Sequence, residues 1–316
     1  MRVIRNTVGN IRPAGKASRA SAVAIGNFDG VHRGHMALID RCKEKAAAGD
    51  HIAVVTFEPL PQAFFQPEAA PARLSTVYQK LSLLAAAGVD IVWLMRFGKG
   101  LASLTAREFV EQALVSDMGG KCIVTGEDFR FGRGREGNSA MLREFGMQMD
   151  FTVETVAAVE CDGQRISSSG IREKLAAGDF AAAAEWLGRP FTMEGRVVRG
   201  AKLGRKLGYP TANIKVRAQP SPVQGVFAVF ARQAGQPWLP AVINLGRRPA
   251  VGGRETLLEV HFFDFDKDLY GQRLEVQFVA KLRDESDFES LDELTGQMKR
   301  DEDQARSCLA QTKMPV

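Results

Sequence analysis

The sequence predicts an α/β doubly wound parallel sheet, followed by a small antiparallel β-barrel domain with a C-terminal helix. Two observations predict this order. Up to about residue 186, short apolar runs alternate with helical patterns, as they do in βαβ units. From residue 187 onward, short and partly alternating segments are separated by turns that contain Gly, Pro and Asp. We therefore expect two domains, residues 1–186 and residues 187–316.

Strands and helices are expected to alternate through the first domain. The strands are expected at residues 22–25, 51–57, 89–94, 121–125 and 151–159, and the helices at 36–48, 76–87, 105–118 and 139–146. Gly49 and Gly88 follow the first two helices, where a glycine commonly ends a helix. Thr105 and Glu108 have the spacing of a capping box. This alternation favours parallel strands.

The second domain is expected to be the barrel. Its strands are expected at residues 191–199, 225–231, 239–245, 257–263 and 273–280. A final helix is expected at residues 290–310, with its apolar face formed by Leu291, Leu294, Met298, Ala305 and Leu309. The other positions of this helix are largely charged, so we expect the apolar face to cover the barrel.

Composition is typical of a soluble globular protein, with 45% hydrophobic and 25% charged residues among 316. The net charge of +5 would permit binding to nucleic acid. However, basic residues are spread along the chain, and aromatic residues do not interleave with them as a base-stacking surface requires. We therefore expect anionic small-molecule substrates, no nucleic acid, and no protein partner.

Four cysteines, none in a C-x-x-C pattern, favour a reducing compartment over a disulfide framework. The first 28 residues contain five basic residues and no acid, so a transit peptide is an alternative. They run without a break into the expected strand at 22–25, and no apolar run approaches the roughly 18 residues of a membrane span. We expect a cytoplasmic protein that does not cross a membrane.

The stretch G-N-F-D-G-V-H-R-G-H at residues 26–35 links the first strand to the first helix. His32 and His35 lie three residues apart and therefore share one face of the helix start. Backbone N–H groups and the helix dipole lie beside them, and glycines let the backbone approach a ligand, which suits a polyphosphate. A metal held by both histidines and an ordinary capped helix are the alternatives.

Two later stretches of the first domain also suit a nucleotide or a flavin-like ring. Residues 126–138 form a glycine-rich loop in which Phe129 and Phe131 stand among arginines, a pattern that suits a flat ring bearing a phosphate. A surface loop is the alternative reading. Residues 166–172 read I-S-S-S-G-I-R, where serine hydroxyls and Arg172 could hold phosphate oxygens. The serines could equally be plain helix caps.

In the second domain, glycines and cations cluster at residues 200–213 before a proline-fixed turn, and they could wrap phosphates. The Thr211 hydroxyl and the Asn213 carbonyl oxygen are available there to Mg²⁺ or to ATP. Glu259 stands in a strand whose alternation places it on the face of Leu257 and His261. Periodicity alone favours a solvent-facing glutamate at this position.

Together these motifs resemble those of the bifunctional riboflavin kinase/FMN adenylyltransferases, the bacterial FAD synthetases. G-N-F-D-G-V-H-R-G-H and I-S-S-S-G-I-R resemble the two motifs of a Rossmann-like nucleotidyltransferase domain. G-Y-P-T-A-N at residues 208–213 resembles the flavokinase hallmark, and the runs at 244–249, 258–261, 268–271 and 282–283 are similar to that family. Leu60, Asn138 and Ala250 depart from the usual pattern and affect only details of ligand contacts.

The resemblance implies phosphorylation of riboflavin to FMN and adenylyl transfer from ATP to FMN, which gives FAD. It implies that His32, His35, Arg172 and Glu259 are catalytic, with Glu259 as the general base of the kinase. For the adenylyltransferase it implies an ATP site of Gly26, Asn27, Phe28, His32, His35, Ser168, Ser169 and Arg172, and flavin contacts by Asp128 and Phe129. For the kinase it implies a site of Gly204, Lys206, Thr211, Asn213 and Arg283, with Mg²⁺ at Thr211 and Asn213.

Two rival functions compete with this interpretation. One is a single-activity adenylyltransferase whose barrel only binds flavin and regulates, which the G-Y-P-T-A-N run and Glu259 argue against. The other is a flavin- or nucleic-acid-binding regulator that keeps the fold without activity. The two histidines and Arg172 argue against the latter.

Overall fold

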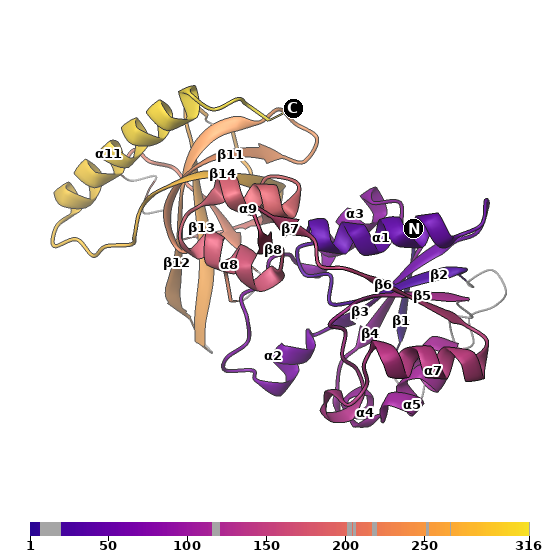
Figure 1. Ribbon diagram of the computed structural model, residues 1–316. Coiled ribbons are helices and arrows are strands. Elements are labelled where there is room, and N and C mark those ends of the chain that lie inside the picture. Colours follow the sequence, from indigo (N-terminus) through magenta and orange to yellow (C-terminus); the bar gives the residue numbers. More distant parts are fainter. Residues whose placement is uncertain are drawn as a thin grey trace. The chain divides into compact units, whose positions relative to one another are not determined.

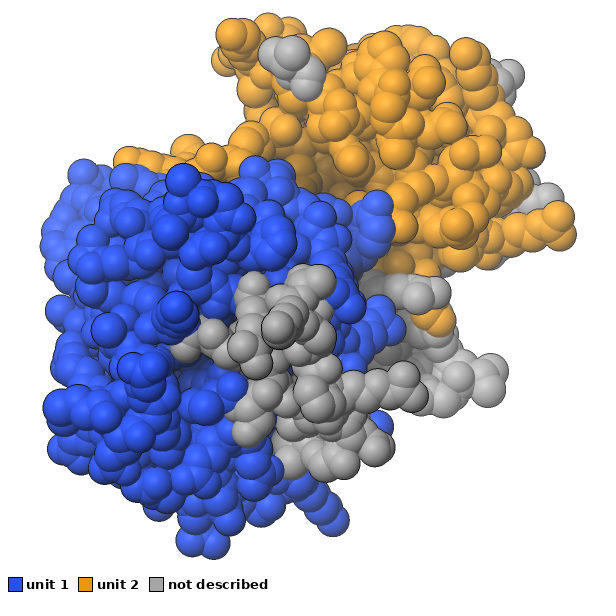
Figure 2. Space-filling model, turned by 90° about the vertical axis from the view of Figure 1, so that its right-hand side faces the viewer, with its two compact units in different colours: residues 1–71, 75–167 blue, residues 72–74, 168–316 orange. Residues whose placement is uncertain are grey.

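The structure is a computed structural model that describes residues 1–6, 20–115, 121–200, 204, 207–216, 220–250, 253–265 and 267–315. Contacts divide the chain into two compact units (Figure 2). The first comprises residues 1–71 and 75–167, and the second comprises residues 72–74 and 168–316. Residues 168–186 thus group with the barrel by contacts. The functional domain boundary after residue 186 stays a prediction.

The first unit is built on a six-stranded parallel sheet (Figure 1). Its strands are β1 (Arg2–Asn6), β2 (Ala22–Ile25), β3 (Ile52–Glu58), β4 (Ile91–Arg96), β5 (Cys122–Gly126) and β6 (Thr152–Val156). Their order is β1-β4-β3-β2-β5-β6, with parallel pairing throughout. The predicted doubly wound sheet is confirmed.

Helices cover both faces of this sheet (Figure 1). One face carries α1 (Arg33–Lys45) and α3 (Val77–Ala86), and the other carries α4 (Lys99–Ser103), α5 (Ala106–Phe109), the π-helical η2 (Val110–Val115) and α7 (Ser139–Met149). Successive residues of β2 alternate between the two cores, with Ala24 packing under α1 and Ile25 under the other group. Strands buried on both faces explain their continuous apolar runs.

The strand β1 is not among the elements expected from the sequence. It pairs in parallel with β4, from Arg2 opposite Ile91 to Asn6 opposite Met95. Because it is an edge strand with Val3 exposed, it lacks the apolar run by which the central strands are recognised. The short helix α2 (Pro61–Phe65) and the hairpin of β7 (Glu160–Cys161) and β8 (Gln164–Arg165) are likewise additions.

Helix boundaries follow local capping chemistry. The Thr105 hydroxyl accepts a hydrogen bond from the Glu108 backbone N–H at 3.2 Å, and the Glu108 carboxylate accepts one from the Thr105 backbone N–H at 2.8 Å. The predicted capping box is therefore confirmed. The helix continues as η2 to Val115, and residues 116–118 of the predicted helix lie outside the described residues.

The second unit contains a closed antiparallel barrel with the order β10-β13-β12-β11-β14-β9. Its strands are β9 (Thr192–Val198), β10 (Ala212–Lys215), β11 (Gly225–Gln233), β12 (Leu239–Ala250), β13 (Gly253–Phe262) and β14 (Arg273–Arg283). The predicted barrel is confirmed. The four-residue β10 is an addition, because a segment this short shows no clear alternation.

In the part of the second unit that the structure describes, the helices beside the barrel include α8 (Ser168–Ala176), α9 (Phe180–Leu187) and α11 (Leu291–Ala310). On α9, the ring of Phe180 packs against the rings of Phe227 and Phe278. On α11, Ala305 and Leu309 are buried in a cluster with barrel residues, as predicted for a covering helix. Leu291 is 57% exposed, so it does not belong to the covering face.

Candidate active sites

The first candidate site lies at the switch point of the parallel sheet. The chain runs outward from β2 to β3 and β4, and then returns to β5 and β6 on the other side of β2. The loops after β2 and β5 therefore emerge side by side at the carboxyl edge of the sheet, where open α/β sheets bind ligands. These loops contain most of the residues that the sequence assigns to the adenylyltransferase.

The loop after β2 has a strained backbone. Phe28, Gly30 and Val31 have φ angles of 49°, 79° and 41°, in the left-handed region. This conformation is rare for Phe and for a β-branched residue, and each instance costs about 1–3 kcal/mol. The side chains of Phe28 and Val31 are buried in the core under α1, which holds the loop in this shape. Strain maintained in this way is typical of ligand-binding loops.

Polar side chains beneath the loop also hold it. The Ser75 hydroxyl accepts a hydrogen bond from the Gly30 backbone N–H at 3.0 Å, and the buried Asp29 carboxylate accepts one from the Ser75 backbone N–H at 3.2 Å. Asp29 therefore helps to hold the loop in its conformation. No sequence pattern links Ser75 to this loop, because the two are 45 residues apart.

Lys80 is a second support that the sequence analysis missed. It lies on α3 with no exposed surface, and its Nζ donates to the Asn27 carbonyl at 2.9 Å and to the Thr56 hydroxyl at 3.2 Å. The Thr56 hydroxyl donates to the same Asn27 carbonyl at 2.8 Å. A fully buried lysine is rare unless its ammonium group is hydrogen-bonded. It fixes the backbone of Asn27, an expected ATP contact.

His32 and His35 lie together at the start of α1. Their rings stack with centroids 3.7 Å apart, and the His32 backbone N–H donates to Nδ1 of His35 at 3.3 Å. Because Nδ1 of His35 accepts, the proton of the neutral ring is on Nε2. A Cβ at Gly34 would lie 3.1 Å from the His32 ring, so this glycine makes room for it. Among the described residues, no metal-sized group of acidic, Cys or His side chains includes these histidines.

The loop after β5 supplies one exposed and one half-buried candidate. Asp128 is exposed and pairs with Arg165 at 2.7 Å, and Phe129 stacks on Phe131 with centroids 5.4 Å apart. Phe131 is buried in the core, so only Phe129 is available to a ligand ring. Asn138 ends the loop by capping α7, with its side-chain oxygen accepting from Ala140 and Met141.

The remaining adenylyltransferase candidates lie in the second unit. Ser168 and Ser169 are the first two residues of α8. Arg172 lies one turn later, and its Nε donates to the backbone carbonyl of Ala72 in the same unit. This hydrogen bond holds the Arg172 side chain against the backbone. Its contact with phosphate stays a prediction.

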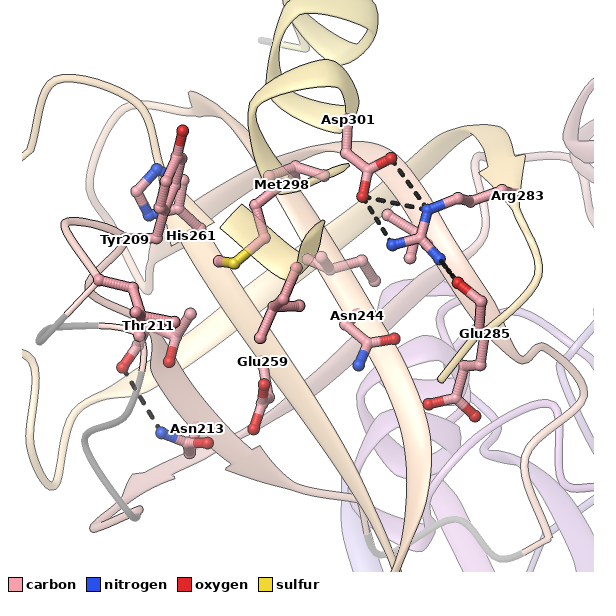
Figure 3. Close-up of a pocket in the computed structure, with 17 residues that line it drawn as sticks. Tyr209, Thr211, Asn213, Asn244, Glu259, His261, Arg283, Glu285, Met298 and Asp301 are labelled. Atoms are coloured by element: carbon pink, nitrogen blue, oxygen red, sulfur yellow. Dashed lines mark hydrogen bonds and ion pairs between the residues drawn. The ribbon is translucent and has the colours of Figure 1, made fainter. Parts of the chain in front are cut away.

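The second candidate site is a pocket of about 210 Å³ between the barrel and α11, many times the 10–15 Å³ or so that one water needs (Figure 3). The predicted residues Gly204, Thr211, Asn213, Glu259 and Arg283 line it, and so the barrel fold brings these separate motifs together. Lys206 lies outside the described residues. Further lining residues, not expected from the sequence, include Tyr209, Asn244, His261, Glu285, Met298 and Asp301.

Glu259 faces this pocket from β13. Leu258 and Val260, its neighbours in sequence, are buried in the barrel, whereas Glu259 and His261 point to the opposite face. The alternation predicted for this strand is therefore confirmed. The face that periodicity alone would leave to solvent is the wall of a pocket, because α11 covers it.

The turn before β10 is tightly built. The Gly204 carbonyl accepts from the Tyr209 backbone N–H at 2.8 Å, and a Cβ at Gly204 would lie 2.3 Å from the Tyr209 carbonyl oxygen. The pKa of Tyr209 is raised by burial and by the nearby carboxylates of Glu302 and Asp303. Asn213, which follows on β10, is buried and donates from Nδ2 to the Thr211 carbonyl at 3.5 Å.

Arg283 is held in place by α11. Its guanidinium donates to the buried Asp301 carboxylate at 2.7–3.1 Å, and also to the Asp284 carbonyl and the Ser286 hydroxyl. Arg283 lines the pocket, but most of its donors are used within the protein. A ligand contact by Arg283 therefore stays a prediction.

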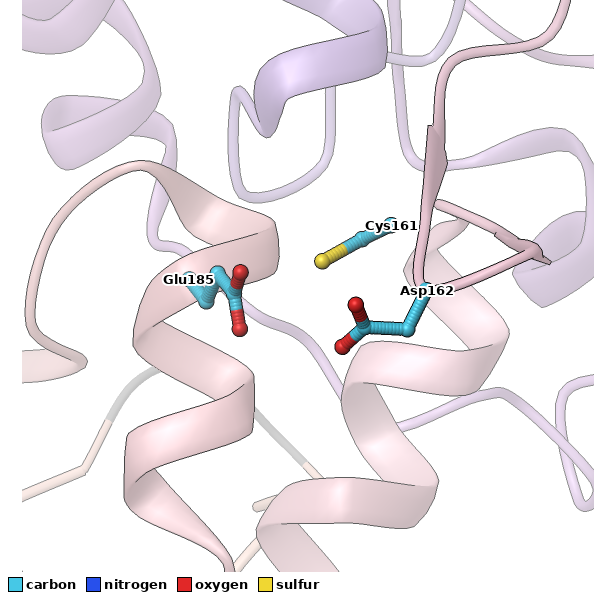
Figure 4. Close-up of side chains that lie close together, drawn as sticks. All are labelled: Cys161, Asp162 and Glu185. Atoms are coloured by element: carbon cyan, nitrogen blue, oxygen red, sulfur yellow. The ribbon is translucent and has the colours of Figure 1, made fainter.

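Two further groups of chemically active side chains carry no site. Cys161 and Asp162 belong to the β7–β8 hairpin of the first unit, whereas Glu185 lies on α9 of the second (Figure 4). We assign no metal site to residues divided in this way. None of the four cysteines forms a disulfide, and burial raises the pKa of the Cys42 thiol to about 12, which makes it unreactive. In the described part of the chain, no helix has the length and apolarity of a membrane span.

Comparison with known proteins separates the chain into two matching regions. Residues 15–170 match the FAD synthetase family and residues 187–309 match the riboflavin kinase family. A bifunctional riboflavin kinase/FMN adenylyltransferase from Escherichia coli K12 is 44% identical over 292 residues, covering 92% of this chain and 93% of that protein. The chain belongs to the bifunctional riboflavin kinase/FMN adenylyltransferase family.

Other members and a solved structure agree with this membership. The family member from Pseudomonas fluorescens is 44% identical over 312 residues, with 98% of both chains covered. A crystal structure described as a macrolide-efflux protein from Streptococcus pneumoniae has a TM-score of 0.79 and 30% identity, covering 97% of this chain and 99% of that one. It shares the fold, and its described activity is not carried over.

Proposed function

We propose that this chain phosphorylates riboflavin to FMN in its barrel pocket and transfers AMP from ATP to FMN at its parallel sheet, giving FAD and pyrophosphate. The observation that carries the proposal is the barrel pocket in which Glu259 and the P-T-A-N segment meet. A barrel that only regulates would need no carboxylate beside this segment. ATP, riboflavin and FMN are the small-molecule substrates.

In the kinase step, the Glu259 carboxylate accepts the proton of the riboflavin 5′-hydroxyl while that oxygen attacks the γ-phosphorus of ATP. ADP leaves, and the phosphoryl group is transferred to the flavin. A positioned general base of this kind typically contributes about 10² to 10⁴ in rate. The side chain of Glu259 is half-buried in the pocket wall, which supports this role.

Mg²⁺ is proposed at Thr211 and Asn213. A hydroxyl and a carboxamide oxygen are hard donors of the type that Mg²⁺ prefers, and few protein ligands suffice because water and phosphate complete its shell. Both residues line the pocket, and Asn213 Nδ2 lies 3.5 Å from the Thr211 carbonyl oxygen. When bound, Mg²⁺ would neutralise phosphate charge.

In the adenylyl step, a phosphate oxygen of FMN attacks the α-phosphorus of ATP and pyrophosphate leaves. Catalysis consists largely of positioning and charge stabilisation. The His35 Nε2–H and the backbone N–H groups at the start of α1 are suited to donate to phosphate oxygens, and His32 supports His35 by stacking. Gly26, Asn27 and Phe28 lie between β2 and α1 and are proposed to contact ATP from there.

The other roles follow from motif and exposure. The motif resemblance assigns Ser168, Ser169 and Arg172 to the same nucleotide, and Phe129 and Asp128 to the flavin. The half-buried ring of Phe129 supports a stacking role. Cysteines that form no disulfide, together with the choice of substrates, support a cytoplasmic location.

One experiment tests both activities. The whole chain is incubated with riboflavin, ATP and Mg²⁺, and the flavins are separated by chromatography. We expect FMN followed by FAD. Glu259→Gln should lose about 10² to 10⁴ in FMN formation but still convert supplied FMN to FAD. His35→Ala and Arg172→Ala should each lose about 10² to 10³ in FAD formation while FMN accumulates.

Matched variants control for nonspecific damage. Glu275→Gln changes a strand glutamate that pairs with Arg232 outside the pocket, and His51→Ala changes an exposed histidine just before β3. Both should keep both activities. If Glu259→Gln phosphorylates riboflavin within a few-fold of the rate of the unmodified enzyme, Glu259 is not the general base. Conversion of supplied FMN to FAD, with no FMN formed from riboflavin, would favour the single-activity alternative.

A further inference from the structure

The peptide between Asn27 and Phe28 is held from the interior of the first unit by two donors on separate elements. Lys80 Nζ, on α3, donates to the Asn27 carbonyl at 2.9 Å, and the Thr56 hydroxyl, on β3, donates to the same oxygen at 2.8 Å. Lys80 Nζ also donates to the Thr56 hydroxyl at 3.2 Å. Neither Lys80 nor Thr56 has any exposed surface, whereas Asn27 is exposed. The Asn27 carbonyl therefore points into the protein.

The direction of this carbonyl sets the direction of the next N–H group. The peptide is trans, and the carbonyl and the N–H of a planar trans peptide point in opposite directions. The Phe28 N–H therefore points to the outer side of the loop. The Phe28 ring contacts the ring of His35 at the start of α1, with centroids 4.9 Å apart, so this N–H belongs to the same site as the histidines. Backbone N–H groups presented by a turn are suited to bind phosphate oxygens.

This orientation of the peptide is not the one that Phe28 by itself favours. The φ angle of Phe28 is 49°, in the left-handed region that is rare for this residue type. Turning the peptide by about 180° would give Phe28 a negative φ in the broad β region and relieve the strain. The same turn would replace the outward N–H by an outward carbonyl, which cannot donate to a phosphate oxygen. The two hydrogen bonds to the Asn27 carbonyl oppose this turn.

We propose that Lys80 is a positioning residue of the adenylyl step. Together with Thr56 it keeps the Asn27–Phe28 peptide in its strained orientation, so that the Phe28 N–H donates to a phosphate oxygen of ATP. Replacing a buried charged group by an apolar side chain of similar volume often costs no stability, so filling this space does not by itself require a lysine. A donor that reaches the Asn27 carbonyl does require one. This inference rests on the proposed adenylyl transfer.

Substitutions at the two donors test this role in the conversion of supplied FMN to FAD. Lys80→Met keeps the side-chain length and removes the ammonium group, and Thr56→Val keeps the shape and removes the hydroxyl. Each should raise the KM for ATP by about 10- to 100-fold, the value of one hydrogen bond to a charged group, and leave the KM for FMN unchanged. The double variant should lose little beyond the larger single effect, because both donors act through one N–H group.

Controls separate positioning from general damage to the loop. Thr56→Ser retains the hydroxyl and should keep the KM for ATP near that of the unmodified enzyme. Lys43→Met changes an exposed lysine of α1 that pairs with Asp40, and it should also leave this KM unchanged. A crystal structure of the double variant should show a negative φ at Phe28. If Lys80→Met does not fold, Thr56→Val compared with Thr56→Ser provides the same test.

Three results would overturn the inference. An unchanged KM for ATP in folded Lys80→Met and Thr56→Val would show that neither donor positions an ATP contact. Equal rises in the KM for ATP and the KM for FMN would show a general loss of loop structure. A double-variant effect equal to the product of the single effects would show that the donors act through different groups. Absence of FAD formation from FMN by the unmodified chain would instead refute the proposed adenylyl transfer itself, before any variant is compared.

Discussion

At the scale of single residues, His261 shows how a ring nitrogen acquires a defined role. Nδ1 of His261 lies 2.9 Å from the Pro210 carbonyl oxygen. A carbonyl can only accept, so Nδ1 carries a proton and donates. The Tyr209 ring packs against the edge of the imidazole with centroids 5.2 Å apart, and Nε2 lies 4.0 Å from a Glu302 carboxylate oxygen. His261 therefore fixes the turn that precedes Thr211.

We predict that this hydrogen bond positions the ATP-binding turn. His261→Ala should raise the KM for ATP in riboflavin phosphorylation by about three- to tenfold, the value of one neutral hydrogen bond. His261→Asn places a side-chain N–H near the former Nδ1 and should restore most of the affinity, whereas His261→Gln should resemble Ala. Steady-state kinetics with ATP varied at saturating riboflavin measure the effect.

The conservative variant makes this prediction specific. If His261 had only a general structural role, the Asn and Gln variants would have the same KM for ATP. Equal KM values for the Asn and Gln variants would therefore contradict a positioning role. Conversion of supplied FMN to FAD provides the internal reference, because His261 lies in the barrel unit.

At the scale of elements, α11 completes the kinase pocket. Leu294, Met298 and Asp301 line it from this helix. Hydrophobic contacts of Ala305 and Leu309 attach its C-terminal half to the barrel, while the Asp301–Arg283 pair attaches its middle to β14. Gln297 also donates to Asp301 at 2.7 Å. The helix is therefore part of the site as well as a cover.

We predict that the Asp301–Arg283 pair fixes this helix. Asp301→Asn removes the charge from a buried, multiply bonded pair and should lower the free energy of unfolding by about 3–5 kcal/mol. Riboflavin phosphorylation should weaken with it, because Met298 and Leu294 shape the pocket. Denaturant unfolding monitored by circular dichroism measures the stability.

A neighbouring aspartate provides the matched control. Asp303 is two residues further along α11 and is exposed, so Asp303→Asn should change the free energy of unfolding by no more than about 0.5 kcal/mol. Equal stability of the two variants would contradict the role of the buried pair.

At the scale of the whole molecule, the described kinase candidates all lie in the second compact unit, whereas the adenylyltransferase candidates are divided between the two units. The pocket around Glu259 lies entirely within residues 204–301. Contacts nevertheless place α8 and α9 with the barrel, where Phe180 packs on Phe227 and Phe278. The match to the FAD synthetase family ends at residue 170, and the match to the riboflavin kinase family begins at residue 187, so both limits fall in this helical segment.

We predict that the barrel unit works alone. A fragment of residues 168–316 should fold and convert riboflavin to FMN without making FAD. A fragment of residues 187–316 should also make FMN but be less stable by about 3–5 kcal/mol, because it lacks Phe180 and exposes the rings beneath it. Flavin chromatography and thermal unfolding measure the two properties.

The outcome of the fragment comparison separates two models. If a folded 168–316 fragment has no kinase activity where the whole chain does, the kinase site needs residues of the first unit. Equal stability of the two fragments would show that α9 adds little to the barrel.

The sequence by itself determined the fold class and most of the candidate residues. Apolar runs alternating with helical patterns predict the parallel sheet, since these signals are local and repeat through the first domain. The glycine and histidine spacing at residues 26–35 predicts a phosphate-binding loop, because glycine conformations and helix starts depend on nearby residues. Strand alternation also gave the correct face for Glu259.

Only the tertiary structure decided what surrounds these residues. Asn244 lies 15 positions before Glu259 and becomes its neighbour through the register of β12 and β13, which long-range pairing sets. The burial of Lys80 and Asp301 depends on partners at Asn27 and Arg283, distant in sequence. From sequence alone, a charged residue is predicted to lie on the surface, because a charge is buried only when it is paired or hydrogen-bonded and the sequence does not identify the partner.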